Sequence, residues 1–238
     1  MISLRKMVVM ILGAALLTLT ACNEKTSEAT DHKDEIHEEP LEQVQEEEQK
    51  EEEQVHEEQP IDQGEPTEGM PPTSLEAATT VMRILKNGDM SNLAAWAHPD
   101  KGIRFSPYAY VDQEKDLVFL REELEVLMEN STVYEWRTFP GSGDLIELTY
   151  ADYHKKFVYD ADFFKDAKIS LNEVQGESTT TNNLNKVYPK ATYDFVEYYI
   201  DGIDPSFEGM DWRSLRLVFE KIEHDHILVG IIHDQWTP

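Results

Sequence analysis

The stretch SLRLVFEKIEHDHILVGIIHDQW, residues 214–236, decides the fold class of this chain. Its first part alternates, placing Leu215, Leu217 and Phe219 on one face of an extended strand. A second apolar run starts at residue 227, and the polar turn EHDH at 223–226 separates the two runs. The pattern therefore predicts a C-terminal β-hairpin.

Helical signals precede this hairpin. Thr73-Ser74-Leu75-Glu76 is a capping-box pattern, and apolar residues at helical spacing follow it as far as Gly88. Further helices are expected at 89–98, 120–130 and 149–159, and strands at 131–139 and 191–200. Helices first and strands last predict an α+β domain, with N-terminal helices packed on a curved, mainly antiparallel sheet.

Two resemblances accompany this pattern. The element order is similar to that of the NTF2-like cone fold, which implies a ligand cavity between sheet and helices. The segment 83–236 resembles an uncharacterised domain of lipoproteins from Gram-positive bacteria, through the stretches HPDKGIRFSPYAYV (98–111), GMDWRSLRLVFE (209–220) and LVGIIHDQWT (228–237). That family implies a location and one folded unit, but no activity.

Charge divides the chain into three parts. It carries 21 basic and 48 acidic side chains, a formal net charge of −27, which argues against nucleic acid as a partner. Residues 22–71 are rich in Glu and Gln and contain no aromatic residue, so a disordered, extended acidic tether is expected. Residues 72–238 hold most of the aromatic residues and form one predicted globular domain.

The first 22 residues predict the location. Arg5 and Lys6 precede the apolar run 7–19, which is too short to cross a bilayer comfortably but suits a signal peptide. Leu19-Thr20-Ala21-Cys22 resembles the lipobox of bacterial lipoproteins. The resemblance implies removal of residues 1–21, a diacylglycerol on the Cys22 sulfur, and a lipid anchor on the outer face of the cell membrane. An ordinary secreted protein with an incidental cysteine is the alternative.

A first group of candidate ligand-binding residues follows the second predicted helix. It contains His98, Arg104, Tyr108 and Tyr110, which are the side-chain types that line a polar pocket. The alternative interpretation is structural: Pro99 ends a helix, Gly102 makes a turn, and the tyrosines belong to an edge strand.

A second group lies at the two open ends of the predicted hairpin. Asp211, Trp212 and Arg213 enter its first strand, and His233 and Trp236 end the second. Antiparallel pairing is expected to bring these residues to one rim of the sheet, where a His–Asp pair is typical of general acid–base chemistry. A structural salt bridge at the sheet end is the alternative.

The sequence lacks the usual catalytic signatures: G-x-S-x-G, H-E-x-x-H, C-x-x-C and the P-loop are all missing. The acidic loop 201–211 does not match a calcium-loop spacing, so neither a metal site nor a cofactor is predicted. We therefore expect a non-enzymatic binding or interaction module for a small molecule, a wall fragment or an envelope protein. A small hydrolase acting on wall or nutrient molecules through Asp211, Arg213 and His233 is the alternative.

Overall fold

The computed structural model describes residues 71–176 and 180–237 of the 238-residue chain. The predicted signal peptide and nearly all of the predicted tether, residues 1–70, lie outside the described residues. The helices are α1 (Ser74–Asn87), α2 (Met90–Trp96), α3 (Arg121–Leu127), α4 (Tyr150–Phe157), α5 (Phe163–Asp166), α6 (Leu184–Val187) and the 3-10 turn η1 (Pro205–Phe207). The strands are β1 (Ile103–Ser106), β2 (Leu117–Phe119), β3 (Tyr134–Thr138), β4 (Leu145–Leu148), β5 (Lys168–Leu171), β6 (Tyr193–Ile200), β7 (Arg213–Ile222) and β8 (Asp225–Gln235).

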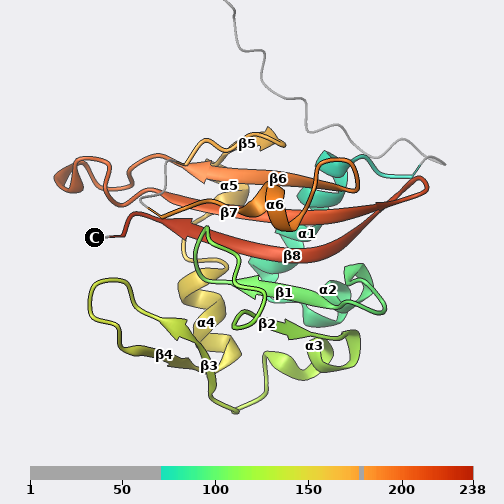
Figure 1. Cartoon of the computed structure of the whole chain (residues 1–238), viewed down its shortest axis with the longest axis horizontal. Helices are drawn as coiled ribbons and strands as arrows, with labels where there is room; N and C mark the ends of the chain where they lie inside the picture. The colour runs from blue at the N-terminus through green and yellow to red at the C-terminus, as the bar shows by residue number, and fades with distance from the viewer. Residues whose placement is uncertain (1–70, 177–179, 238) are drawn as a thin grey trace, which may run out of the picture. The chain divides into compact units, whose positions relative to one another are not determined.

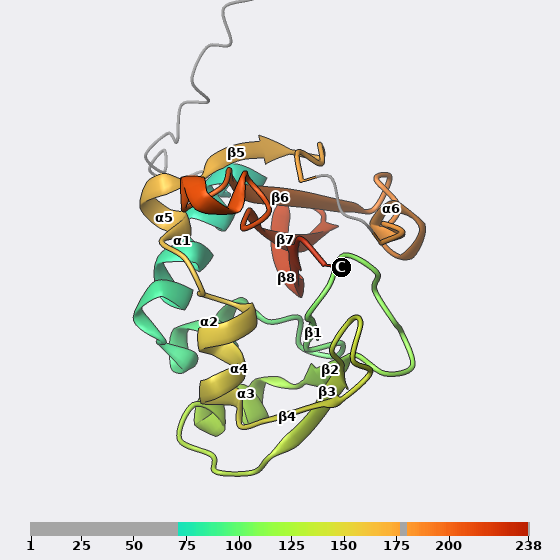
Figure 2. The same ribbon diagram turned by 90° about the vertical axis from the view of Figure 1, so that its left-hand side faces the viewer.

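The fold is α+β, as the sequence predicts. Six strands form one curved sheet in the order β2-β1-β8-β7-β6-β5, and all neighbours are antiparallel except β1 and β8 (Figure 1). Strands β3 and β4 form a separate two-stranded sheet (Figure 2). The parallel pair arises because β1 lies beside the last strand of the chain, a neighbour that no local pattern specifies.

The predicted hairpin is confirmed and contains one bulge. Val218 pairs with Gly230 and Phe219 with Leu228, so Val229 is the extra residue on β8. The bulge shifts the alternation by one position. Leu228 and Ile231 therefore both face the large core, while Val229 and Ile232 face a second, smaller one. This explains why the last strand is a continuous apolar run.

The large core lies between the main sheet and helices α1, α2 and α4, together with the β3–β4 sheet. Helix α1 begins with the predicted capping box: Thr73 and Glu76 exchange hydrogen bonds, and Gly88 ends the helix at φ 63°. Thr149 caps the N-terminus of α4, which lies within the helix predicted for 149–159. The other face of the sheet is covered by α6 and the segment around Val111. In the part of the chain that the structure describes, no helix is long and apolar enough to cross a membrane.

Candidate functional site

The rim of the hairpin brings His233 and Arg213 together through a shared partner, Asp160, which the sequence analysis did not predict. The His233 Nε2 atom lies 3.2 Å from Asp160 Oδ2, and Arg213 Nε forms an ion pair with the same oxygen at 2.7 Å. Asp160 follows α4, so it belongs to the segment that leads from α4 to α5. Burial acts to raise the pKa of Asp160, but His233 and Arg213 outweigh it and hold that pKa below its usual value.

His233 is fully buried and both of its ring nitrogens are engaged. Its Nδ1 atom lies 3.3 Å from the carbonyl oxygen of Pro107, and Nε2 faces Asp160. Both partners are hydrogen-bond acceptors of the protein itself, so both ring nitrogens are engaged within the domain. No ring nitrogen is left to take a proton from a substrate. The arrangement thus fits a buried salt bridge at the sheet end better than a general base.

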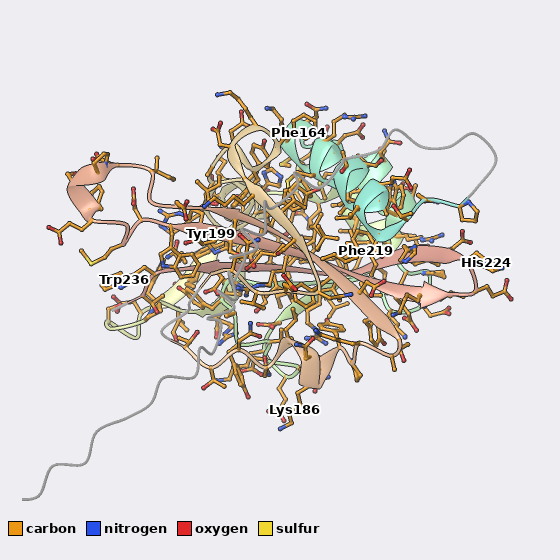
Figure 3. The ribbon with its side chains drawn as sticks, turned by 90° about the horizontal axis from the view of Figure 1, so that it is seen from above. Phe164, Lys186, Tyr199, Phe219, His224 and Trp236 are labelled. Atoms are coloured by element: carbon orange, nitrogen blue, oxygen red, sulfur yellow. The ribbon has the colours of Figure 1, made fainter. Side chains whose placement is uncertain are left out.

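The other rim residues have separate surroundings. Asp211 faces its own loop, where its Oδ2 atom accepts a hydrogen bond of 2.7 Å from the Asp204 backbone amide. Trp212 is buried against the Tyr199 ring, at 6.0 Å between centroids. Trp236 is 38% exposed and lies at the end of the hairpin away from His224 (Figure 3). The expected His233–Asp211 pair is therefore replaced by His233–Asp160.

His98 stabilises a turn of the backbone and, among the described residues, does not line a pocket with the other candidate residues. Its Nδ1 atom accepts hydrogen bonds from the backbone amides of Asp100 (3.1 Å) and Lys101 (3.0 Å), and Nε2 lies 3.5 Å from Glu220. The ring thus closes the turn that leads into β1. Arg104 points to the other side of the sheet from Phe105 and lines a separate pocket with Lys101. These two residues of the first candidate group are therefore not brought together with Tyr108 and Tyr110.

Tyr108 and Tyr110 instead meet at Arg137. The Arg137 guanidinium lies 5.8 Å from the Tyr108 ring centroid and 6.0 Å from that of Tyr110, and it donates a 2.7 Å hydrogen bond to the Tyr110 carbonyl. It also pairs with Asp116 Oδ1 at 3.1 Å. The Asp116 side chain is fully buried, and burial raises its pKa although Arg137 acts to lower it.

Arg137 also opens onto solvent. With Asp112, Lys115, Glu135 and Thr138 it lines a pocket of about 270 Å³. Two carboxylates and two cationic side chains therefore surround one small space. We call this space the Arg137 pocket.

Behind Arg137 lies a group of buried tyrosines. The hydroxyls of Tyr108, Tyr150 and Tyr153 are buried and have no hydrogen-bond partner among the described residues. Burial raises the pKa of Tyr108 to about 12 and also raises the pKa values of Tyr150 and Tyr153, and the charges of Asp116 and Arg137 act on Tyr153. A buried hydroxyl without a partner costs about 1–3 kcal/mol, so three such hydroxyls in one core require an explanation.

The sequence analysis did not predict five residues of these sites: Arg137, Asp116, Asp160, Tyr150 and Tyr153. Tyr150 and Tyr153 sit three residues apart on α4, a spacing typical of one apolar helix face, so they carry no separate signal of a site. Arg137 lies on the short strand β3 between the buried Trp136 and the exposed Thr138, and no sequence motif distinguishes it. Among the residues that the structure describes, no group of three or more His, Cys, Asp or Glu side chains could hold a metal ion.

His154 lies beside the tyrosines on α4, and its burial should make the stability of the domain sensitive to acid. Burial lowers the pKa of His154 to about 4, whereas an unfolded histidine titrates near 6.5. Between these values the unfolded chain binds the proton and the folded chain does not. This contribution to stability is thus complete above pH 6.5 and is lost as the pH falls toward 4.

This pKa shift of His154 corresponds to a loss of about 3 kcal/mol in the free energy of unfolding between pH 6.5 and pH 4. We expect His154→Gln to flatten the unfolding free energy between pH 6.5 and 4, as measured by urea titration at several pH values. His224→Gln, in the exposed hairpin turn, is the control and should leave the slope unchanged. An unchanged slope in His154→Gln would contradict the assignment.

Comparison with known proteins adds little. No family model matches the chain, and no curated protein matches it. The solved structure of Aln2 from a Streptomyces species is similar with a TM-score of 0.29 and 11% identity, over 70% of this chain and 93% of Aln2. Similarity this weak carries no argument about fold family or function.

Proposed function

We propose that this chain is a lipoprotein, anchored by Cys22 to the outer face of the cell membrane, whose domain binds a small polar ligand in the Arg137 pocket. The lipobox-like sequence 19–22 supports the anchor, and the acidic stretch 22–71 supports a flexible tether. We further propose that the domain has an NTF2-like fold and that it is related to the domains of Gram-positive lipoproteins that it resembles.

One observation carries the binding role. The buried hydroxyls of Tyr108, Tyr150 and Tyr153 lack partners among the described residues, and the charge of Arg137, whose guanidinium lines an open pocket, acts on Tyr108 and Tyr153. A polar ligand that reaches past Arg137 would supply those partners and recover the free energy that the unpartnered hydroxyls cost. The pocket rim offers carboxylates at Asp112 and Glu135 and cations at Lys115 and Arg137. This mixture suits a zwitterion, such as an amino acid or a short peptide from the cell wall.

Phenylalanine at position 150 tests the unpartnered hydroxyl. Tyr150→Phe removes an oxygen that nothing satisfies and keeps the ring, so the free energy of unfolding without ligand should rise by about 1–3 kcal/mol. Urea unfolding followed by tryptophan fluorescence measures the change.

Tyr159→Phe is the matched control for this measurement. The Tyr159 hydroxyl donates to Asp162 Oδ1 at 2.5 Å, so its removal should lower stability by about 1 kcal/mol. A destabilised Tyr150→Phe would mean that the hydroxyl is already satisfied, and the argument for a ligand would lose its main support.

Cys22→Ser tests the anchor. The sulfur is the nucleophile that accepts the diacylglycerol, and the serine hydroxyl is a much poorer one, so the variant should lack the lipid. Mass spectrometry of the N-terminal peptide should show a lipidated Cys22 in the wild type and an unmodified peptide in the variant. Ala21→Gly, which keeps the lipobox pattern, should remain lipidated. A wild-type chain without lipid at Cys22 would contradict the proposal.

A further inference from the structure

A second pocket also includes a residue of the 112–116 turn, Gln113, whereas Asp112 and Lys115 line the Arg137 pocket. It has a volume of about 220 Å³ and is lined by Lys101, Arg104, Val118, Val187, Tyr188 and Tyr193, with the bulged Val229 and with Gln113 from the turn. Its walls therefore come from β1, β2, α6, β6 and β8. No carboxylate is among the residues that line it.

Arg104 brings a positive charge that no acidic side chain balances. Its Nη1 atom contacts the carbonyl oxygens of Asp112 (3.4 Å), Gln113 (3.4 Å) and Asp116 (3.3 Å). These long contacts orient the guanidinium without neutralising it. In the described part of the chain, Arg104 forms no ion pair, whereas Arg137, Arg213 and Arg216 each pair with a carboxylate.

The second cation is already balanced. Lys101 Nζ lies 2.5 Å from Glu220 Oε2, and His98 Nε2 lies 3.5 Å from the same oxygen. Lys101 also lies 5.6 Å from the centroid of the Tyr193 ring. The unbalanced charge at this pocket is therefore the one on Arg104, in a chain whose formal net charge is −27.

The rest of the pocket is aromatic and aliphatic. The rings of Tyr188 and Tyr193 meet edge to face at 5.3 Å, and three valines complete the walls. Burial raises the pKa of Tyr188 to about 12, although the nearby Arg104 acts to lower it, so the hydroxyl stays neutral and able to donate a hydrogen bond.

We propose that this pocket binds a small monocarboxylate, whose carboxylate group pairs with Arg104 and whose short apolar body lies against Tyr188, Tyr193 and Val229. A guanidinium binds a carboxylate through two parallel hydrogen bonds, which a single ammonium does not offer. The valine and tyrosine walls favour a ligand with an apolar body over inorganic phosphate. The site is separate from the Arg137 pocket, so its failure would leave the proposed function untouched.

Isobutyrate is a suitable probe, because isobutyramide has the same shape without the charge. Calorimetric titration of the full chain in detergent should show binding of isobutyrate and at least tenfold weaker binding of isobutyramide and of inorganic phosphate. Arg104→Gln should weaken isobutyrate binding by at least about tenfold, because it removes one charged hydrogen-bonding partner. Arg83→Gln makes the same change of charge on the exposed face of α1 and should leave the affinity unchanged.

Val187→Glu provides a second test should Arg104→Gln fold poorly. Residue 187 is half-buried at the pocket wall, so a glutamate there adds a negative charge without opening the core, and it should also weaken isobutyrate binding at least about tenfold. Equal binding of isobutyramide or phosphate, no binding of isobutyrate to the wild type, or unchanged binding in the folded variants would each overturn the proposal.

Discussion

Replacing Arg216 by methionine is expected to lower the free energy of unfolding by about 3–5 kcal/mol. The Arg216 side chain is completely buried between two acidic side chains. Its Nη2 atom lies 2.8 Å from Glu197 Oε1 and 3.0 Å from Asp234 Oδ2, and its Nε atom donates to the same Glu197 oxygen at 2.9 Å. Without the guanidinium, two buried carboxylates on β6 and β8, the strands on either side of β7, lose their countercharge.

The triple variant Glu197→Gln, Arg216→Met, Asp234→Asn separates charge from packing. It removes all three charges while keeping similar side-chain volumes, so it should recover most of the loss. Urea unfolding of the wild type and both variants measures the difference. A loss below about 1 kcal/mol in Arg216→Met would show that this network contributes little to holding β6, β7 and β8 together.

Replacing Arg137 by methionine is expected to cost a similar amount, about 3–5 kcal/mol at neutral pH. The Asp116 carboxylate is fully buried, and Arg137 is its ion-pair partner at 3.1 Å. Burial already raises the pKa of Asp116, and the loss of Arg137 raises it further.

The sign of the pH dependence follows from that direction. When the pKa of a carboxyl group is higher in the folded state than in the unfolded state, the folded protein binds the proton more tightly. Its free energy of unfolding therefore rises as the pH falls and the carboxyl group becomes protonated. The deficit of Arg137→Met should therefore shrink as the pH falls toward 4 and grow as the pH rises. Adding Asp116→Asn should remove both the pH dependence and most of the deficit. A deficit that stays constant from pH 7 to pH 4 would contradict the role of Asp116.

The fold was predictable where a secondary-structure element depends only on residues close together in the sequence. The alternation at Leu215, Leu217 and Phe219 and the turn at 223–226 are local, and they specify the hairpin correctly. The capping box at Thr73 and the stop at Gly88 are local too. The parallel contact of β1 with β8 and the short strands β2 and β5 were not predictable, because they depend on neighbours far away in the sequence.

The candidate site was predictable only in part, for the same reason. Pairing of β7 with β8 correctly brings Arg213 and His233 to one rim, but it says nothing about Asp160, which reaches them from the segment after α4. Tyr108 and Tyr110 were named from residue type alone. Tyr108 and Tyr110 lie in the segment after β1, whereas their shared partner, Arg137, lies on β3, so the contact exists only in the folded domain.

Thermal unfolding of the full chain in detergent, screened against amino acids, short wall peptides and wall sugars, directly tests whether the Arg137 pocket binds a zwitterion. A ligand at 100 times its dissociation constant stabilises by about 2.7 kcal/mol, or about 5–10 °C for a domain of this size. The Asp116→Asn, Arg137→Met variant keeps the buried site uncharged and serves as the comparison. We expect a zwitterionic compound to raise the melting temperature of the wild type and not that of the variant. No shift with any compound, or an equal shift in both proteins, would contradict it.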